Sequence, residues 1–297
     1  MTEIVTKERL QLYYWWHGSN FGDELNPWLW PQFISDLVDS ENFHTAKTNA
    51  SGALFIGVGT LLNQRLPANP KIIFGSGVGY GNPQVDAKWH IYFVRGPLSA
   101  DALGLDKSYA ITDPVILLRA LKLPAVEKRY KCSFMPHHDS LNTANWAKVC
   151  RDLDIHFIDP TASFEEGLHQ LMASELVICE AMHAAIIADT LNIPWVPITL
   201  HRHINEFKWK DWCQSVGVDY APTTLPYPLR LIRHKMNRAI SQRLIRPLNN
   251  LFAHYGLYRS KKAVPQLSDV NVKDELVTRI LARIDLLRSD FSKGKFL

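Results

Sequence analysis

Several side chains that could bind or activate an anionic substrate follow predicted strands in this 297-residue chain. Arg95 lies at the end of the apolar run HIYFVRG, and Gly96 and Pro97 after it predict the start of a helix. A guanidinium beside a helix N-terminus can bind a carboxylate or a phosphate through two parallel hydrogen bonds. Arg95 therefore predicts an anion site, with an interdomain salt bridge as the alternative.

Histidines occur at two further strand ends. His137 and His138 follow the run KCSFMP, and His183 lies in the first turn of a predicted helix, shortly after Glu180. A histidine in such a position can act as an acid, a base or an anion ligand near neutral pH. Neighbouring histidines are expected to point in different directions, so we predict anion binding or acid–base chemistry at His137 and no metal site. The alternatives are a purely structural His183 and helix capping by Asp139 or Ser140.

Basic and aromatic side chains are interleaved in HRHINEFKWKDWCQS (201–215), which we interpret as a loop. Arg202 and Lys208, with the neighbouring tryptophans, suit an anionic sugar ligand, and the same pattern suits single-stranded nucleic acid. Nucleic acid is disfavoured because no RRM, KH or OB signature accompanies the pattern. The glycine turns GVGT (57–60) and GSGVGYG (75–81) could approach a phosphate, but neither matches a dinucleotide or P-loop fingerprint.

The segment GSNFGDELNP predicts the start of a helix near the N-terminus. Asn20 can cap this helix, and Asp23 and Glu24 favour its positive N-terminal end. Two prolines, Pro27 and Pro31, are expected to break the helix after its first turns.

Short apolar runs alternate with amphipathic stretches, which predicts strands in series with helices. Such βα units form parallel sheets covered by helices. The pattern is interrupted at 119–130, so we predict an α/β protein with two Rossmann-like domains, 1–122 and 123–225. Their ligand is expected at the carboxyl ends of the strands, in a cleft between the domains. The strands are predicted within 11–17, 53–59, 71–77, 90–96, 131–140, 155–160, 175–180 and 193–200.

Residues 226–297 form a third predicted segment, which is basic and helical. No acid occurs between Asp219 and Asp269, where nine Lys and Arg residues lie, although the net charge of the whole chain is only +4. Apolar residues recur every four positions from Ile232 to Leu248, and NVKDELVTRILARIDLLRS predicts a terminal amphipathic helix. A basic segment on an otherwise acidic chain indicates an anionic partner. The apolar stripe could equally pack on the domains and leave the arginines in solvent.

The composition indicates a globular protein of a reducing compartment. Apolar residues make up 46% of the chain, and its four cysteines form neither a CxxC pair nor a Cys/His cluster. No stretch approaches the roughly 18 apolar residues of a membrane span. The first residues, MTEIVTKERL, are too charged for a signal peptide. We therefore predict a cytoplasmic location.

Taken in order, these stretches resemble the polysaccharide pyruvyl transferase family. The resemblance spans most of residues 14–220 and is strongest for the branch that adds ketal-linked pyruvate to bacterial exopolysaccharides. It implies a GT-B-like arrangement of the two domains, phosphoenolpyruvate as the donor substrate, and no further cofactor or metal. The motifs that carry it are NFGDELNP, GVGT, GSGVG, VRGPLSA, the TDP at 112–114, MHAAIIADTLNIPWV and FKWKDW.

The resemblance also implies roles for the basic residues. Arg95 and His183 would bind the donor, and His183 would assist phosphate departure as an acid. Arg202, Lys208 and His137 would complete the anion site. Cations are required because a donor with nearly three negative charges cannot enter a dry cleft unpaired.

On the acceptor side, Asp23 would take a proton from a sugar hydroxyl, while Asn20 and Glu24 would position the sugar. One position departs from the family pattern. Many relatives have an arginine two residues before the helix histidine, where this chain has Ala181. Another cation must then replace the missing guanidinium.

Acceptors in pathways of this kind are lipid-linked oligosaccharides at the inner face of the plasma membrane. Residues 229–262 would then contact anionic headgroups as a peripheral membrane surface. A GT-B-type glycosyltransferase that uses a nucleotide sugar is the alternative function, with Glu180 as the carboxylate on the ribose. A non-catalytic scaffold protein of polysaccharide assembly is a third interpretation.

Overall fold

The structure is a computed structural model that describes residues 9–15, 21–39, 52–201, 204–224 and 245–296. Its first half contains a sheet of four parallel strands in the order β1-β2-β3-β4. Strands β2 and β3 are buried along their whole length, which explains why all their residues except Lys71 are apolar. The four strands are β1 (Gln11–Tyr13), β2 (Leu54–Ile56), β3 (Lys71–Phe74) and β4 (Trp89–Phe93).

Helix α1 (Phe21–Ile34) is anchored on this sheet by the asparagine of its Asn-Pro pair. The Asn26 side chain donates to the carbonyl oxygen of Val58 at 3.0 Å and accepts from the Val58 N–H at 2.9 Å. Trp30, one turn later, packs edge-on against a ring of β2 and a ring of β3. The predicted break is wrong, because α1 runs through Pro27 and Pro31 as one helix held by these tertiary contacts.

The second half contains five parallel strands in the order β6-β5-β7-β8-β9. They are β5 (Ser133–Met135), β6 (His156–Phe157), β7 (Val177–Cys179), β8 (Trp195–Thr199) and β9 (Thr223–Thr224). Between them run α3 (Trp146–Asp152), α4 (Phe164–Met172) and α5 (Met182–Thr190). The prediction of an α/β protein with parallel sheets is confirmed.

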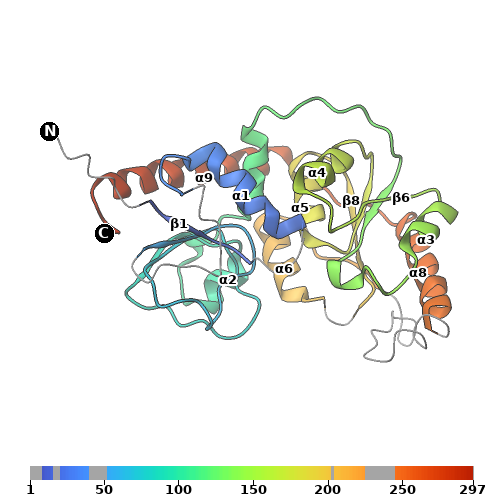
Figure 1. Cartoon of the computed structure of the whole chain (residues 1–297), viewed down its shortest axis with the longest axis horizontal. Helices are drawn as coiled ribbons and strands as arrows, with labels where there is room; N and C mark the ends of the chain where they lie inside the picture. The colour runs from blue at the N-terminus through green and yellow to red at the C-terminus, as the bar shows by residue number, and fades with distance from the viewer. Residues whose placement is uncertain (1–8, 16–20, 40–51, 202–203, 225–244, 297) are drawn as a thin grey trace.

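The two halves are joined by the irregular connection 121–130, which arches over the second half in Figure 1. A short 3-10 helix, η2 (Pro114–Ala120), precedes this connection and packs against α5 of the second half. One cluster of buried residues contains Phe55 and Phe74 of the first sheet together with Val177 and Cys179 of the second. The halves therefore share a core.

The C-terminal helices divide between the two halves. Helix α8 (Arg246–Ser260) packs on α3 and β8 of the second half. Helix α9 (Val270–Ser292) returns to the first half, where Tyr92 Oη donates to Asp290 Oδ2 at 2.6 Å. The terminal helix expected from the sequence is confirmed, whereas most of the predicted apolar stripe lies outside the described residues. No described helix combines the length and the apolar composition that a membrane span requires.

One element differs from expectation. Residues 201–215 contain helix α6 (Glu206–Ser215) where a loop was predicted. Asn205 caps α6 by accepting the Phe207 N–H at 3.0 Å, and Trp209 and Trp212 are buried on its inner face. Their spacing of three residues is a helical signal that the surrounding charges concealed. Helix α2 (Pro97–Ala102) of the first half lies directly against α6.

Candidate active site

A cavity of about 650 Å³ lies where the carboxyl ends of strands from both sheets meet. This is the predicted position of a ligand site in such a fold. The first half contributes the turns after β1, β2 and β3, and the second half contributes the turns after β5 and β7 and the start of α6. Its lining includes Tyr13, Trp15, Thr60, Arg65, Tyr80, His137, His138, Asp139, Glu180, Ala181, His183, Asn205 and Lys208.

His183 lies in the first turn of α5 with its ring against α1. A Cβ added to Gly22 would collide with that ring, so the glycine of NFGDEL is required for the close approach. The Nε2 atom of His183 is fully enclosed and has no hydrogen-bond partner among the described residues. Burial, with smaller contributions from the positive charges of Lys208 and Arg95, lowers the pKa of His183 to about 3. The imidazole is therefore neutral at pH 7.

The N-terminus of α5 opens into the same cavity. Ala181, Met182 and His183 all line it, and the methyl group of Ala181 at the cap position cannot accept a hydrogen bond from the helix. Unsatisfied N–H groups at a helix N-terminus favour an anion. The enclosed His183 nitrogen and the open helix end thus lie together at one wall.

Lys208 reaches the cavity from α6. Its Nζ donates to the Tyr80 hydroxyl at 3.1 Å and lies 5.1 Å from the centre of the Tyr80 ring. The structure therefore brings three predicted donor residues, His137, His183 and Lys208, to one cavity.

Glu180 ties the strand ends of the second sheet together. This fully buried carboxylate accepts the His137 N–H at 3.1 Å and the Leu200 N–H at 3.3 Å. Its Oε1 also lies 3.2 Å from Nδ1 of His201. Both carboxylate oxygens therefore already contact the protein, and they fix the turns after β5 and β8 relative to β7.

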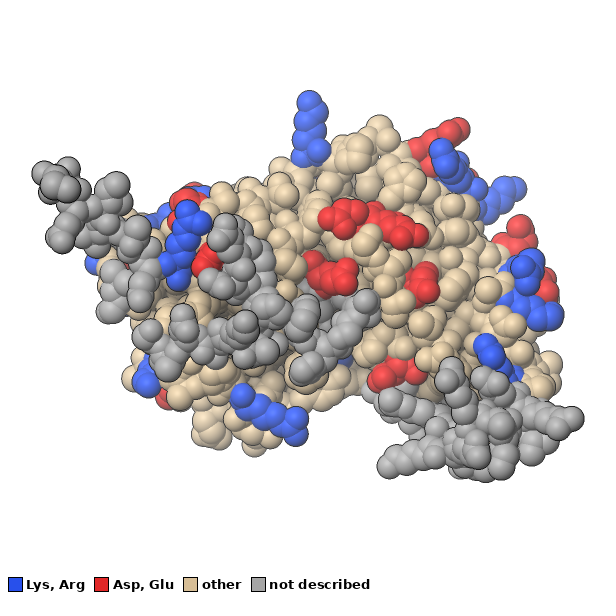
Figure 2. Space-filling view, in the orientation of Figure 1, with Lys and Arg blue, Asp and Glu red and all other residues tan. Residues whose placement is uncertain are grey.

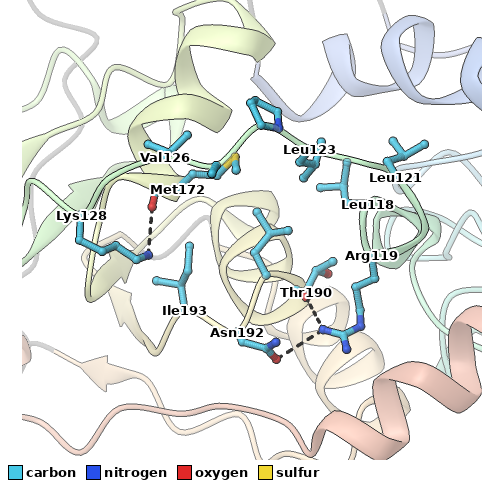
Figure 3. Close-up of a pocket in the computed structure, with 13 residues that line it drawn as sticks. Leu118, Arg119, Leu121, Leu123, Val126, Lys128, Met172, Thr190, Asn192 and Ile193 are labelled. Atoms are coloured by element: carbon cyan, nitrogen blue, oxygen red, sulfur yellow. Dashed lines mark hydrogen bonds between the residues drawn. The ribbon is translucent and has the colours of Figure 1, made fainter.

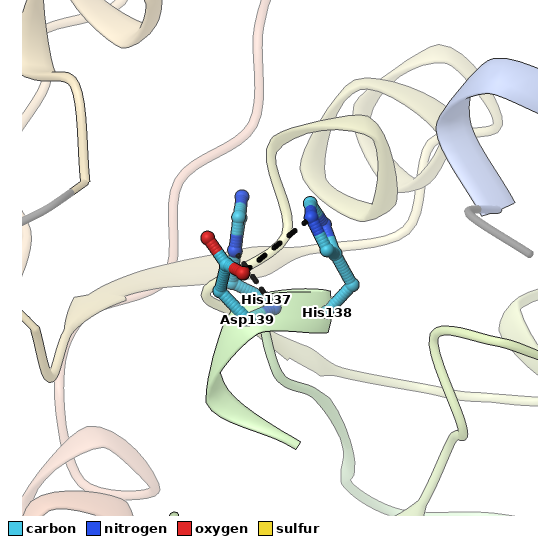
Figure 4. Close-up of side chains that lie close together, drawn as sticks. All are labelled: His137, His138 and Asp139. Carbon is cyan, nitrogen blue, oxygen red and sulfur yellow. Dashed lines mark hydrogen bonds and ion pairs between the residues drawn. The ribbon is translucent and has the colours of Figure 1, made fainter. Parts of the chain in front are cut away.

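His137 and His138 lie side by side, with ring centres 4.2 Å apart (Figure 4), so the expectation that they point in different directions is wrong. The short 3-10 helix η3 (His138–Ser140) turns the chain back at this point, and His137 Nδ1 accepts the Asp139 N–H at 3.2 Å. Potential ligand atoms of His137, His138 and Asp139 lie within 4.8 Å of one another. Among the described residues, these three form a group that could hold a metal ion. That the protein uses no metal remains a prediction.

Arg95 was predicted to bind the ligand directly, but its side chain does not line the cavity. The residue is fully buried, and its Nε donates to Asp211 Oδ2 of α6 at 3.0 Å. Its two terminal nitrogens donate to Thr60 Oγ1 at 2.8 Å and to the Val78 carbonyl at 3.1 Å. The salt-bridge alternative applies, since the guanidinium fastens α6 to the first half. Arg95 still supports the site from behind, because Thr60 lines the cavity.

The TDP motif is structural in the same way. Asp113 caps η2 by accepting the Val115 N–H at 3.1 Å and is completely buried near Arg95. Burial raises the pKa of Asp113 to about 6, although the charge of Arg95 opposes the shift.

Comparison with known proteins identifies the group to which the chain belongs. The sequence model of the family described as "Polysaccharide pyruvyl transferase" matches residues 20–202. The chain belongs to this family. It is also 37% identical over 226 residues to the "Succinoglycan biosynthesis protein ExoV" of Rhizobium meliloti (strain 1021). The aligned region covers 73% of this chain and 68% of that protein. The chain is therefore an enzyme, a pyruvyl transferase.

A solved structure of an uncharacterized protein from Klebsiella pneumoniae subsp. pneumoniae NTUH-K2044 superposes with a TM-score of 0.41 at 14% identity. The match covers 74% of this pyruvyl transferase and 93% of that chain.

The acceptor-side predictions fall mainly outside the cavity or outside the described part of this pyruvyl transferase. Asn20 and Arg202 lie outside the described residues, and Asp23 lies in α1 with a side chain that is not described. Glu24 is not among the cavity residues, so its predicted acceptor contact is not supported. Its carboxylate lies at the start of α4, where burial and Glu165 raise its pKa and a bond from the Phe164 N–H lowers it.

The surroundings of Glu24 are acidic. On the face drawn in Figure 2, acidic side chains gather over α1 and α4, and α4 carries Glu165 and Glu166 in its first turn. Such a face repels anions, whereas the cavity contains the cationic side chains of Arg65 and Lys208.

The cavity of this pyruvyl transferase also contains residues that were not predicted from the sequence, among them Trp15, Thr60, Arg65 and Tyr80. Among the described residues, the cavity is lined by one arginine and one lysine, Arg65 and Lys208. Both are candidates to replace the arginine that is absent at Ala181. The sequence signal for Thr60 and Tyr80 was their position in the glycine turns GVGT and GSGVGYG.

A second hollow, of about 460 Å³, lies beneath the connection between the halves (Figure 3). Its two cations are already engaged, since Arg119 donates to the Thr190 carbonyl and Lys128 to the Met172 carbonyl. The remaining lining is largely apolar, so this hollow does not match an anionic donor.

Proposed function

We propose that this pyruvyl transferase transfers the pyruvyl group of phosphoenolpyruvate to two hydroxyls of one sugar and forms a pyruvate ketal. The observation that carries the proposal is the enclosed, neutral His183 beside Lys208, at the open N-terminus of α5. Each half has its own parallel sheet, and the strand ends of both sheets meet at this cavity, which supports a GT-B-like arrangement of the halves.

The donor's negative charges account for the electrostatics of the site. Lys208, His137 and the N–H groups of α5 would bind its phosphate and carboxylate, with Arg95 adding positive potential from behind Thr60. Burial, aided by the positive charges of Lys208 and Arg95, keeps His183 neutral before the donor binds. A bound anion reverses the local field and raises the pKa of His183, so the imidazole takes up a proton and can donate it to the leaving phosphate.

The reaction then balances as follows. Two sugar hydroxyls form two C–O bonds to C2 of the donor, and the C2–O bond to phosphate breaks. One hydroxyl proton ends on the methylene carbon, which becomes a methyl group, and the other ends on the phosphate. Asp23 as the base for a sugar hydroxyl, and Asn20 and Arg202 as ligands, remain predictions.

The biological setting follows from the relative. A protein named for succinoglycan biosynthesis covers 73% of the chain, so we place the reaction in the synthesis of an exopolysaccharide repeat unit. The four cysteines are buried and unpaired, which supports a cytoplasmic location.

The function is tested by incubating the purified protein with phosphoenolpyruvate and a panel of glycosides. We expect phosphate release that depends on the glycoside, and a product whose mass matches addition of a pyruvate ketal. The alternative glycosyltransferase predicts thermal stabilisation by uridine or guanosine diphosphate instead of phosphoenolpyruvate. It would use Glu180 on the ribose, but both oxygens of that carboxylate already contact the protein.

We further propose that α8 contacts the inner membrane surface within the predicted segment 229–262. One side of α8 is buried, while its other side exposes four large apolar residues spaced three and four positions apart. Cations accompany this face, because Arg259 lies over the Tyr255 ring and Lys262 over the Tyr258 ring. Such a face matches an anionic bilayer that carries the lipid-linked acceptor. The exposed residues are Leu248, Leu251, Tyr255 and Tyr258.

Replacing Leu251 and Tyr255 together by Glu is expected to lower co-sedimentation with phosphatidylglycerol vesicles by about tenfold or more, because both apolar area and charge attraction are lost. The matched control is Leu286→Glu on the exposed face of α9. Equal sedimentation of the double variant and the control would contradict the membrane surface.

A further inference from the structure

We infer that Trp15 and Tyr80 form the platform on which a sugar ring of the acceptor stacks. This inference rests on the proposed function and names a binding site for the second substrate. The cavity of about 650 Å³ is much larger than a three-carbon phosphate, and its two walls differ in chemistry. The wall from the second half carries the histidines, whereas the wall from the first half carries exposed aromatic side chains beside polar ones such as Arg65.

The two aromatic residues lie on turns that follow two non-adjacent strands of the first sheet. Trp15 follows β1 and Tyr80 follows β3, so in the strand order β1-β2-β3 they flank the turn after β2. Both line the cavity, and each is 53% exposed. By contrast, Trp30, Trp195 and Trp212 are almost completely buried. Large aromatic side chains left exposed at a cavity mouth indicate a ligand surface.

The turn that carries Tyr80 is held in place by its neighbours. Gln64 Oε1 accepts the Asn82 N–H at 3.2 Å, and Asn205 of the α6 cap donates its side-chain N–H to the Gly79 carbonyl. Lys208 binds the Tyr80 hydroxyl on the cavity side. A platform that is already ordered loses little conformational entropy when it binds a ligand.

A saccharide fits this surface better than the donor does. Pyranose rings present a face of C–H groups that packs on an aromatic ring, while their hydroxyls remain at the edge for hydrogen bonds. The donor has no ring to stack and needs cations. Because the Tyr80 hydroxyl lies 3.1 Å from Lys208 Nζ, a sugar stacked on Tyr80 would have its hydroxyls next to the donor's anionic groups.

The test separates the two substrates. Trp15→Ala and Tyr80→Ala are each expected to raise KM for the saccharide acceptor by about tenfold, while the Kd for phosphoenolpyruvate changes by less than about twofold. Tyr80→Phe keeps the ring and should keep the acceptor KM. Val85→Ala, an exposed apolar residue in the same first half that does not line the cavity, is the control for substitution itself.

Each outcome decides a different question. An unchanged acceptor KM in both alanine variants overturns the platform while leaving pyruvyl transfer intact. Equal weakening of donor and acceptor also overturns it, since Tyr80 would then act through Lys208. A wild-type protein that neither binds phosphoenolpyruvate nor pyruvylates any glycoside would count against the proposed function. Where alanine lowers the melting temperature, Trp15→Leu and Tyr80→Leu repeat the test with the apolar volume kept and the ring removed.

Discussion

His183→Gln is expected to lower kcat/KM for pyruvyl transfer by about 10²- to 10⁴-fold, the range for loss of a positioned proton donor. Glutamine keeps the size and polarity of the side chain but cannot carry a proton to the phosphate. Acceptor-dependent phosphate release measures the effect. His156→Gln is the matched control, because His156 lies on β6 and its Nε2 pairs with Gln170 instead of lining the cavity.

The same histidine has a second, independent readout. The pKa of His183 is lowered to about 3, so in the free enzyme its imidazole is neutral at pH 7. If donor binding raises that pKa above 7, binding takes up one proton. Titration calorimetry in two buffers of different ionisation enthalpy should detect this uptake in the wild type and not in His183→Gln. Full activity of His183→Gln, or the same uptake in both proteins, would contradict the assignment.

Asp211→Ala is expected to lower the free energy of unfolding by about 3–5 kcal/mol, because it leaves the Arg95 guanidinium buried without its counter-charge. Asp211 accepts from Arg95 Nε at 3.0 Å and from the Ser99 N–H at 2.9 Å. Both residues of the ion pair are fully buried. The loss is a large part of the about 5–15 kcal/mol that stabilises a typical protein. Urea denaturation measures it.

A double-mutant cycle distinguishes the ion pair from general damage. Arg95→Met combined with Asp211→Leu should cost clearly less than the sum of the single changes, because no buried charge is left alone. Glu206→Gln on the same helix removes the exposed pair with Lys210 and should change stability by no more than about 0.5 kcal/mol. A loss below about 1 kcal/mol in Asp211→Ala would show that α6 does not depend on this contact.

The regular elements could be predicted because their signals are local. The buried parallel strand LFI is entirely apolar, and KIIF is apolar after its first residue. Ser163 before α4 and Asp269 before α9 are ordinary helix caps. Helix α6 was missed because its signal, two tryptophans three residues apart, is short and lies among charges. The continuity of α1 through two prolines depends on Asn26 binding the turn after β2, which no local pattern contains.

The candidate site could be predicted only in part, because the role of a side chain depends on partners that are distant in the sequence. His137, His183 and Lys208 follow strands or lie at helix starts, and the order of the strands brings such positions to one edge. Arg95 has the same local signal and a different role. Its partner Asp211 lies 116 residues away, and the VRGPLS and FKWKDW motifs prove to be two sides of one contact.

The sequence by itself determined the α/β class, the two series of strands, the family and the identity of most ionisable groups near the cavity, because periodicity, capping and motif order are properties of neighbouring residues. Only the tertiary structure decided which of those groups face the cavity. Burial and pairing are set by contacts between residues far apart in the chain. For this reason Arg95 forms an internal ion pair, Glu24 lies against α4 and the imidazole of His183 is neutral. The same contacts place Trp15 and Tyr80 at the mouth of the cavity.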